Sequence, residues 1–290
     1  MLNFISKNAR TLDKFLKYYF NQQKYSQLIA PMKYGVLFGG KKIRSTVILS
    51  TSEIFGLKKK QVINICGSVE CIHSYSLVHD DLPCMDNDDI RRGKLSTHKK
   101  YGEATAVLAG NSLLTLAFEI LSDRNLLLKE QIKIKLIKFI SESSGHSGIA
   151  GGQYLDLSFE KKKISIKKII DMQIKKTGKL FIFVCLAPAL IANKEKKIIN
   201  RLEKIGHEIG LLFQIVDDLI DYRGNSKKVG KKTKKDKKKG KATLVSLLGY
   251  QNTIKYAHKL KVAILKKLAI FGKKGDSLRN TIQFILERDK

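Results

Sequence analysis

The sequence contains few prolines, and none of its segments has the alternating pattern of a strand. Prolines occur only at positions 31, 83 and 188 of the 290 residues, which leaves room for long helices joined by short turns. Apolar residues recur at spacings of three and four, as in Leu12, Leu16 and Tyr19, rather than at every second position. The chain is therefore predicted to be all-α, a bundle of long helices, and to form a single domain over residues 1–290.

Cysteine is also scarce, and the four cysteines form no recognisable pattern. They include no CxxC pair and have no histidine companions at the spacing of zinc ligands, which argues against a structural zinc site or a disulfide framework. We expect them to be buried thiols in a reducing compartment, and hence a cytoplasmic protein. The cysteines are Cys66, Cys71, Cys84 and Cys185.

Long apolar runs are missing as well. The N-terminal residues 1–23 have charges scattered through an amphipathic pattern and lack the apolar core of a signal peptide. The longest apolar run, residues 180–192, contains Pro188 and is well short of the ~20 residues that cross a bilayer. We therefore expect neither secretion nor a membrane span.

Acidic residues are outnumbered by basic ones, 26 against 56, which gives a formal net charge of +30. Such a charge leaves a nucleic acid or another polyphosphate open as partner, because lysine-rich surfaces bind polyphosphates by counterion release. Ten of the fifteen residues in the segment 227–241 are lysine. A run of this kind is normally a solvated loop, but here it could also close over a phosphate group.

Despite this shortage, the densest carboxylates fall in two short clusters. Clustered carboxylates repel one another unless a cation lies between them. Oxygen ligands on incomplete shells indicate magnesium, which keeps waters and binds one or two carboxylates together with substrate phosphates. We therefore expect several Mg²⁺ ions and a polyphosphate substrate. The first aspartate motif consists of Asp80, Asp81 and Asp86, and the second of Asp217, Asp218 and Asp221.

The spacing within each motif supports this interpretation. Asp217 and Asp221 are one helical turn apart, so both carboxylates should project from the same face of a helix. In the first motif, Pro83 should end or kink the helix and let Asp86 fold back toward Asp80. Candidate phosphate donors are the basic residues of the glycine-started turn 39–44, the pair Arg91 and Arg92, and Lys176 of the sequence Lys176-Thr177-Gly178.

Taken together, these segments resemble the trans-isoprenyl diphosphate synthases, most closely the bacterial farnesyl-producing group. They follow the family's order along most of the chain. The resemblance implies an isoprenoid synthase-type helical fold around a deep central cavity, usually in a homodimer. It also implies a Mg²⁺-dependent condensation of isopentenyl diphosphate with dimethylallyl or geranyl diphosphate to give farnesyl diphosphate. The matching segments are GGKKIR at 39–44, ECIHSYSLVHDDLPCMDNDDIRRG at 70–93, GGQYLDL at 151–157, KTGKL at 176–180, GLLFQIVDDLID at 210–221, and GK at 230–231 and 240–241.

The resemblance further implies a role for individual residues. Asp80 and Asp86 would hold two Mg²⁺ ions and Asp217 a third, supported by Asp81, Asp218 and Asp221. Lys176, the Thr177 carbonyl and Gln214 would lie near the carbocation, and the released diphosphate would accept the proton. Tyr75 would limit product length, and His79 is interpreted as structural. The allylic diphosphate site would contain Arg91, Lys176, Thr177, Gln214, Lys231 and Lys241, and the isopentenyl diphosphate site Lys41, Arg44, His73 and Arg92.

Three positions depart from the family pattern. Lys42 stands where the family usually has arginine, Tyr154 replaces a small residue, and Val216 stands where glutamine is common. Tyr154 could narrow the cavity or a neighbouring contact, so a geranyl product stays open beside farnesyl, as does geranylgeranyl.

Other function classes account for less of the sequence. A terpene cyclase would not need the isopentenyl diphosphate site, and a catalytically inactive subunit would be expected to have lost motif residues. A basic polyphosphate-binding or nucleic-acid-binding protein without catalysis would explain the charge but not the aspartates. The lysine run also lacks the interleaved aromatic residues of such proteins.

Overall fold

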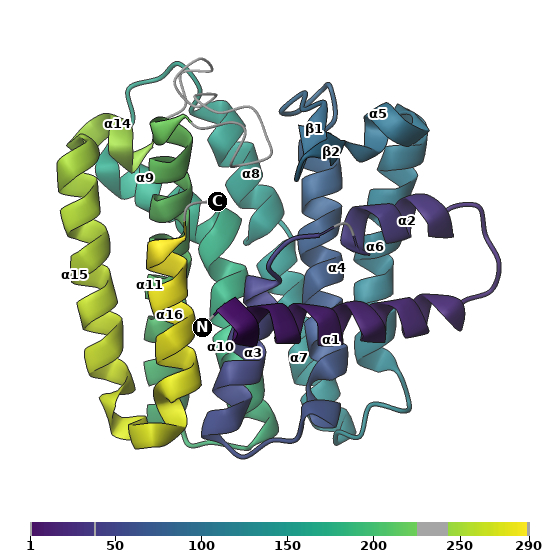
Figure 1. Ribbon diagram of the computed structural model, residues 1–290, viewed down its shortest axis with the longest axis horizontal. Coiled ribbons are helices and arrows are strands. Elements are labelled where there is room, and N and C mark those ends of the chain that lie inside the picture. Colours follow the sequence, from purple (N-terminus) through teal and green to yellow (C-terminus); the bar gives the residue numbers. More distant parts are fainter. Residues whose placement is uncertain (1, 38, 225–242, 289–290) are drawn as a thin grey trace. The chain divides into compact units, whose positions relative to one another are not determined.

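Figure 1 shows the computed structural model, which describes residues 2–37, 39–224 and 243–288. Helices account for nearly all the regular structure in these ranges, and the all-α prediction is confirmed. The chain divides into two compact units, one formed by Met1–Leu49 with Lys58–Ile137 and the other by Ser50–Leu57 with Lys138–Lys290. A single domain over residues 1–290 stays a prediction.

The first unit is arranged around a buried helix, α4 (Ile63–Asp80), which packs along α6 (Glu103–Ser122) (Figure 1). Small and apolar side chains occur all around α4, which is why it can be buried on every side. Helix α1 (Leu2–Asn21) instead buries one stripe that includes Leu12 and Leu16, as its spacing predicts. The unit also contains α2 (Ile29–Leu37), the start of α3 (Ile43–Ile54), η1 (Lys59–Gln61), α5 (Thr97–Tyr101) and the start of α7 (Glu130–Ser144).

One feature of this unit was not expected from the sequence: a hairpin of two short antiparallel strands, β1 (Ile90–Arg91) and β2 (Lys94–Leu95). Ile90 pairs with Leu95 and Arg91 with Lys94, which leaves a two-residue turn of Arg92 and Gly93. Both turn residues have positive φ angles, 53° and 77°, as the favoured type I′ hairpin turn requires. The hairpin therefore directs two consecutive arginines in different directions.

The second unit is arranged around α11 (Lys196–Arg223), which packs against α10 (Lys179–Ile191), α15 (Tyr250–Leu268) and α16 (Asp276–Glu287) (Figure 1). Helix α10 is apolar almost throughout and buried along most of its length, despite Pro188 in its interior. The unit also contains α8 (Ile149–Ser158), α9 (Ile166–Gln173), the π-helical turn η2 (Ile174–Gly178), α14 (Leu244–Leu248) and η3 (Ala269–Gly275).

Helix α6 is, among the described residues, the one helix long and apolar enough to cross a membrane. A core helix of a water-soluble protein has the same length and composition, and α6 packs against α4, α2 and α5. The expectation of no membrane span stays a prediction.

Three of the four cysteines are buried, as expected, but Cys84 is exposed. It follows Pro83 in the turn after α4, where the chain leaves the core. Burial raises the pKa of the Cys71 thiol to about 12, which keeps this side chain protonated and unreactive.

Candidate functional site

The first aspartate motif lies where α4 ends. The helix stops at Asp80, three residues before Pro83, and Asp81 caps its C-terminus. The chain then turns back, and the backbone N–H of Asp86 donates to the carbonyl oxygen of Asp80 at 2.8 Å. The N–H of Asp88 likewise donates to the carbonyl of Asp81 at 3.0 Å. The prediction that Asp86 folds back toward Asp80 is therefore confirmed.

The carboxylate of Asp81 is turned toward the hairpin. The Arg91 guanidinium donates to both of its oxygens, with Nε 3.0 Å from Oδ1 and 3.2 Å from Oδ2, and its Nη2 also contacts Oδ1. Nη2 of Arg91 lies 3.6 Å from Oδ2 of Asp88 as well. Arg91 therefore joins the hairpin to the first aspartate motif and orients Asp81 within it.

The next arginine of the hairpin contacts the glycine-started turn. Nη1 of Arg92 donates to the carbonyl oxygen of Gly39 at 3.0 Å. A Cβ atom on Gly40 would lie 2.6 Å from the Arg92 guanidinium carbon, so only glycine lets the two approach so closely. Since Arg44 lies in the first turn of α3, directly after this turn, the structure brings the segment 39–44 and Arg92 together.

His73 on α4 lies close enough to Arg44 and Arg92 for their charges to affect its pKa. Burial, together with the charges of Arg44 and Arg92, lowers the pKa of His73 well below its usual value of 6.5. The lowered pKa shows that His73 is neutral and that several positively charged side chains lie near its ring. Three of the four residues predicted for the isopentenyl diphosphate site, Arg44, His73 and Arg92, therefore form one basic cluster, and Lys41 lies in the turn beside it.

Lys42, one of the three departures from the family pattern, is buried away from solvent. Its Nζ contacts the carbonyl oxygen of Val36 and lies 3.9 Å from Glu70 Oε2 and 4.0 Å from Asp13 Oδ1. Oε1 of Glu70 accepts a hydrogen bond of 2.8 Å from the Ser45 hydroxyl. Lys42 and Glu70 thus hold the start of α3 on α4, beneath the basic cluster.

Tyr75 and His79 lie on α4, below Asp80. Their rings meet edge to face with centroids 5.8 Å apart, and Tyr75 is buried. Burial, reinforced by the charge of Asp80, raises the pKa of Tyr75 to about 12, so the phenol stays neutral. His79 Nε2 lies 3.0 Å from the Val107 carbonyl oxygen on α6. The structure thus gives His79 a packing contact between the two helices, as the sequence analysis expected.

The second aspartate motif lies on a continuous helix. Because α11 runs from Lys196 to Arg223 without interruption, Asp217 and Asp221 share one face, as predicted. Asp218 projects elsewhere and is fixed by two amides. It accepts from Gln214 Nε2 at 2.9 Å and from Gln173 Nε2 at 3.1 Å. Asp218 is therefore a buried anchor, whereas Asp217 keeps 38% of its side chain exposed.

Thr177 extends this network across the unit. Its hydroxyl donates to Gln214 Oε1 at 2.8 Å, so that Thr177, Gln214, Asp218 and Gln173 form one hydrogen-bonded chain. Gln214 uses its amide oxygen and nitrogen in opposite directions, which fixes its orientation. The structure thus brings together Thr177 and Gln214, two of the three residues assigned to the reaction centre.

The third residue of that group, Lys176, lies in the same π-helical turn η2, and its Nζ donates to Asp156 Oδ2 at 2.6 Å. A π-helical turn interrupts the regular α-helical hydrogen bonds, and such turns are frequent at functional sites. The wider turn also brings Lys176 and Thr177 to different partners: Lys176 contacts α8 and Thr177 contacts α11.

Two glycines hold η2 between its neighbours. A Cβ atom on Gly152 of α8 would lie 2.1 Å from the backbone nitrogen of Lys176. A Cβ atom on Gly210 of α11 would lie 2.5 Å from the Cα atom of Gly178. Neither contact leaves room for a side chain, because the obstacle is backbone on both sides. The position of Lys176 and Thr177 thus depends on these two glycines.

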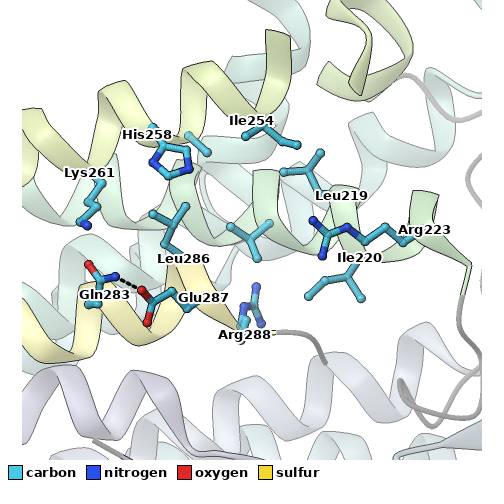
Figure 2. A pocket seen from close by; sticks show the side chains of 12 residues that line it. Leu219, Ile220, Arg223, Ile254, His258, Lys261, Gln283, Leu286, Glu287 and Arg288 are labelled. Carbon is cyan, nitrogen blue, oxygen red and sulfur yellow. Dashed lines mark hydrogen bonds between the residues drawn. The ribbon is translucent and has the colours of Figure 1, made fainter. Parts of the chain in front are cut away.

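Asp217 has a cation as partner. Nη2 of Arg288, the residue after α16, lies 2.8 Å from Asp217 Oδ1. The same nitrogen donates to the carbonyl oxygen of Phe213 at 2.8 Å, and the guanidinium lies 3.7 Å from the centre of the Phe213 ring. Figure 2 shows Arg288 among the residues that line a pocket beside α11, α15 and α16.

The other two departures from the family pattern are Tyr154 and Val216. Tyr154 is 72% exposed, and the expectation that it narrows the cavity stays a prediction. Its possible role at a neighbouring contact stays a prediction. Val216 is buried and lines the pocket of Figure 2. The predicted phosphate ligands Lys231 and Lys241, with the whole segment 227–241, lie outside the described residues.

Within the described ranges, no three histidine, cysteine, aspartate or glutamate side chains are grouped so that they could hold a metal ion. In the first aspartate motif, the carboxylate of Asp81 is bonded to Arg91, which leaves the carboxylates of Asp80 and Asp86 as the candidate metal ligands. The remaining carboxylates match magnesium, whose shell is completed by water and substrate phosphate rather than by protein alone.

Sequence reasoning assigned no role to several residues that the structure places in these networks. Glu70 and Asp156 stood inside matched segments, and a lone carboxylate in an apolar helix is a signal that could have found both. Gln173 and Arg288 carried no such signal, because a polar residue near a helix end is usually exposed.

Comparisons with known proteins agree with the sequence resemblance. The family model described as polyprenyl synthetase matches residues 25–274. A farnesyl diphosphate synthase of Micrococcus luteus is 38% identical over 265 residues, which are 91% of this chain and 90% of the relative. An FPP/GFPP synthase from Zymomonas mobilis, solved without ligand, superposes with a TM-score of 0.88 at 34% identity and covers 98% of this chain and 100% of its own. A geranyltransferase from Helicobacter pylori, complexed with magnesium and isoprenyl diphosphate, superposes with a TM-score of 0.85 at 32% identity, over 98% and 96% of the two chains.

Proposed function

The chain belongs to the polyprenyl synthetase family, and on this basis we propose that it condenses isopentenyl diphosphate with dimethylallyl and geranyl diphosphate to give farnesyl diphosphate. It is a prenyltransferase that joins two diphosphate esters and releases one diphosphate. The observation that carries this proposal is the hairpin of the first unit. Its two arginines contact two different groups, Arg91 the first aspartate motif and Arg92 the turn 39–44. Two substrates that each carry a diphosphate need two such groups.

The allylic diphosphate binds through magnesium at the aspartate motifs. Asp80 and Asp86 would hold two Mg²⁺ ions, and Asp217 would hold a third, with Asp81, Asp218 and Asp221 in supporting places. The structure supports these roles, since Arg91 orients Asp81, two amides fix Asp218, and Asp217 keeps an exposed edge. Bound Mg²⁺ supplies the positive charge that stabilises the departing diphosphate. Arg91, Lys176, Lys231 and Lys241 are proposed as further donors to the allylic diphosphate.

Isopentenyl diphosphate binds at the basic cluster of Lys41, Arg44, His73 and Arg92. Arginine side chains suit this task, because their planar forks match the oxygens of a phosphate. The contact between Arg92 and Gly39 keeps the turn and the hairpin in register before any substrate arrives. Lys42 and Glu70 support the cluster from below, so the charge of Lys42 is balanced within the protein rather than offered to substrate.

The reaction itself needs no side-chain nucleophile. Departure of the diphosphate leaves an allylic carbocation, the isopentenyl double bond attacks it, and a proton is then lost to the released diphosphate. The Thr177 backbone carbonyl and the Gln214 amide oxygen stabilise positive charge where it develops, as preorganised dipoles do. The hydrogen bonds of Gln214 with the Thr177 hydroxyl and Asp218 fix the Gln214 amide in advance.

The product is farnesyl diphosphate because Tyr75 limits the growing tail. The ring lies on α4 slightly more than one helical turn before Asp80, and a large buried ring there would act as a floor for the growing tail. The Zymomonas mobilis structure is described as an FPP/GFPP synthase, so a similar fold accommodates more than one product length.

We propose further that the active form is a homodimer in the cytoplasm, and that none of the described helices spans a membrane. Three buried thiols and one exposed thiol, all unpaired, agree with a reducing compartment. The packing of α6 against α4, α2 and α5 supports the proposal that this helix does not span a membrane.

Product analysis tests the proposed function. The purified chain is incubated with Mg²⁺, isopentenyl diphosphate and labelled dimethylallyl diphosphate, and the products are separated by chain length. A C15 product is expected, and none in an Asp80→Asn variant that stays folded. A C10 or C20 product would keep the enzyme class and replace the proposed product. No product from the unmodified chain, or full turnover by Asp80→Asn, would overturn the proposal.

A further inference from the structure

Arg288 and Asp217 form an ion pair that the mechanism does not use. The guanidinium is almost completely buried, with 6% of the side chain exposed, whereas 38% of the Asp217 side chain is exposed. The backbone N–H of Arg288 donates to the carbonyl oxygen of Phe284 at 3.0 Å, so the end of α16 fixes where its side chain begins. The arginine therefore reaches the motif from the protein side, and the open edge of Asp217 faces solvent.

The contacts of Arg288 offset part of the cost of burying its charge, although its Nε has no hydrogen-bond partner among the described residues. One nitrogen bonds both the Phe213 carbonyl oxygen and Asp217 Oδ1, and the plane lies over the Phe213 ring. Phe213 and Asp217 are one turn apart on α11, so both partners lie on the same helix face. A buried guanidinium is stable only while such partners remain, because an unpaired buried charge is strongly unfavourable.

Arg288 contacts the same carboxylate, Asp217, that the proposed function assigns to a Mg²⁺ ion. In the second aspartate motif, Asp217 pairs with the arginine, and Asp218 accepts hydrogen bonds from two amides. A metal ion on Asp217 and a guanidinium on the same carboxylate are two positive charges at close range, and they repel each other. The metal ion and the guanidinium therefore weaken each other's binding to Asp217.

We propose that Arg288 is an internal counter-ion for Asp217 that competes with the divalent cation and so sets the metal affinity of the second aspartate motif. The inference rests on the proposed function, in which Asp217 is a metal ligand. Without metal, Arg288 offsets the negative charge of Asp217. This reduces the repulsion between Asp217 and the neighbouring carboxylates of Asp218 and Asp221. When metal binds, the guanidinium gives up its contact with Oδ1 and keeps the Phe213 carbonyl.

The pocket of Figure 2 gives the displaced side chain room. Arg288 is part of its lining, and the pocket has a volume of about 180 Å³. Apolar side chains of α11, α15 and α16 form much of its wall, and Arg223 and Lys261 also line it. Since Glu287 is the one acidic residue in that lining and is already bonded to Gln283, the pocket offers the guanidinium little compensation. The arginine therefore returns to Asp217 when the metal leaves.

Titration with Mn²⁺ alone, followed by the electron paramagnetic resonance of the free ion, tests the inference without enzyme turnover. The full-length chain carries Asp80→Asn and Asp86→Asn, so that binding reports on the second aspartate motif. Adding Arg288→Met, which keeps an apolar stem, should strengthen Mn²⁺ binding about tenfold. Arg279→Met is the matched control. Arg279 also lies on α16 but pairs with Asp276, and its loss removes the same charge without touching the motif.

The outcomes separate the two proposals. Equal affinities in the Arg288→Met and Arg279→Met chains, or weaker binding after Arg288→Met, would overturn the competition while leaving Asp217 a metal ligand. Mn²⁺ binding that survives Asp217→Asn unchanged would remove the metal role of Asp217, and with it both proposals at this motif. If Arg288→Met does not fold, Arg288→Lys takes its place. It keeps a charge but loses the planar fork, and a few-fold gain in Mn²⁺ affinity is expected.

Discussion

At the scale of single residues, the position of His73 makes stability depend on pH. Because burial and nearby arginines lower its pKa in the folded protein, protonation is less favourable there than in the unfolded chain. The neutral imidazole therefore contributes stability above pH 6.5, which is lost as the pH falls from 6.5 toward the lowered pKa. For one proton the slope reaches about 1.4 kcal/mol per pH unit.

Replacing His73 by glutamine should remove this contribution. Urea unfolding at pH values of about 7.5, 6.5 and 5.5 would show the unmodified protein losing more stability on the acid side than His73→Gln. The exposed His146 supplies the matched control, since His146→Gln should keep the pH dependence of the unmodified chain. Parallel curves for His73→Gln and the unmodified protein would contradict the assignment.

Tyr75 leads to a second prediction at this scale. Removing its ring in Tyr75→Ala opens space below Asp80, so products should lengthen from C15 to C20 or beyond. Tyr75→Phe keeps the ring and should keep the C15 product, which makes it the matched control. Loss of a buried aromatic side chain costs about 3–5 kcal/mol, so chain length is compared only among folded variants. An unchanged C15 product from Tyr75→Ala would locate the limit elsewhere.

The sequence predicted the local backbone geometry of the aspartate motifs well. It did not predict which side chains pair with these aspartates. Asp86 folds back toward Asp80 because Pro83 forbids a longer helix, a purely local cause. The pairing of Asp81 with Arg91 and of Asp217 with Arg288 depends on tertiary placement, which spacing along the chain does not encode. Lys42 belongs to the turn 39–44, whose basic residues were candidate phosphate donors, yet its Nζ is buried 3.9 Å from Glu70 Oε2.

At the scale of elements, the helices followed from the apolar period, but two irregular elements did not. The hairpin strands are two residues long, too short for any alternation, although Gly93 could have suggested the turn. The π-helical turn η2 differs from an α-helix by one extra residue in the turn. The spacing of apolar residues along the sequence does not reveal such a local insertion. Both irregular elements carry site residues, Arg91 and Arg92 in the first, Lys176 and Thr177 in the second.

The packing of η2 on α11 leads to a prediction with opposite signs for two glycines. Gly210→Ala places a Cβ atom against the Gly178 backbone, so α11 must move and the Thr177 to Gln214 bond should weaken. We expect a loss of about 1–3 kcal/mol of stability and a lower kcat. Gly178→Ala meets Ile174 at an ordinary 3.5 Å, and the better helix propensity of alanine should leave stability unchanged or raise it.

Thermal unfolding and steady-state kinetics of the two alanine variants would decide this point. If Gly210→Ala were as stable and active as Gly178→Ala, the close approach of α11 to η2 would not be needed. A Gly210→Ala chain that is stable but slow would instead show that the glycine matters for positioning Gln214 and not for folding.

At the scale of the whole molecule, the overall identity of the chain was readable from its sequence because its motifs are ordered along most of its length. The family match over residues 25–274 spans both compact units, so neither unit alone carries the family's motifs. The first unit contains the basic cluster and the first aspartate motif, and the second contains the residues proposed for the reaction centre and the second aspartate motif. The two halves of the chemistry therefore depend on one continuous chain.

The net charge of +30 leads to the last prediction, which concerns the molecule as a whole. So many like charges repel one another in the compact state, and dissolved salt screens that repulsion beyond about 10 Å at 0.1 M. Raising NaCl from about 0.01 M to about 0.2 M should therefore raise the melting temperature by several degrees, measured by differential scanning fluorimetry at constant pH. Replacing the salt by sucrose of equal osmolality separates screening from general exclusion effects, since sucrose carries no charge. A melting temperature that does not change with NaCl would mean that the lysines lie too far apart to oppose folding.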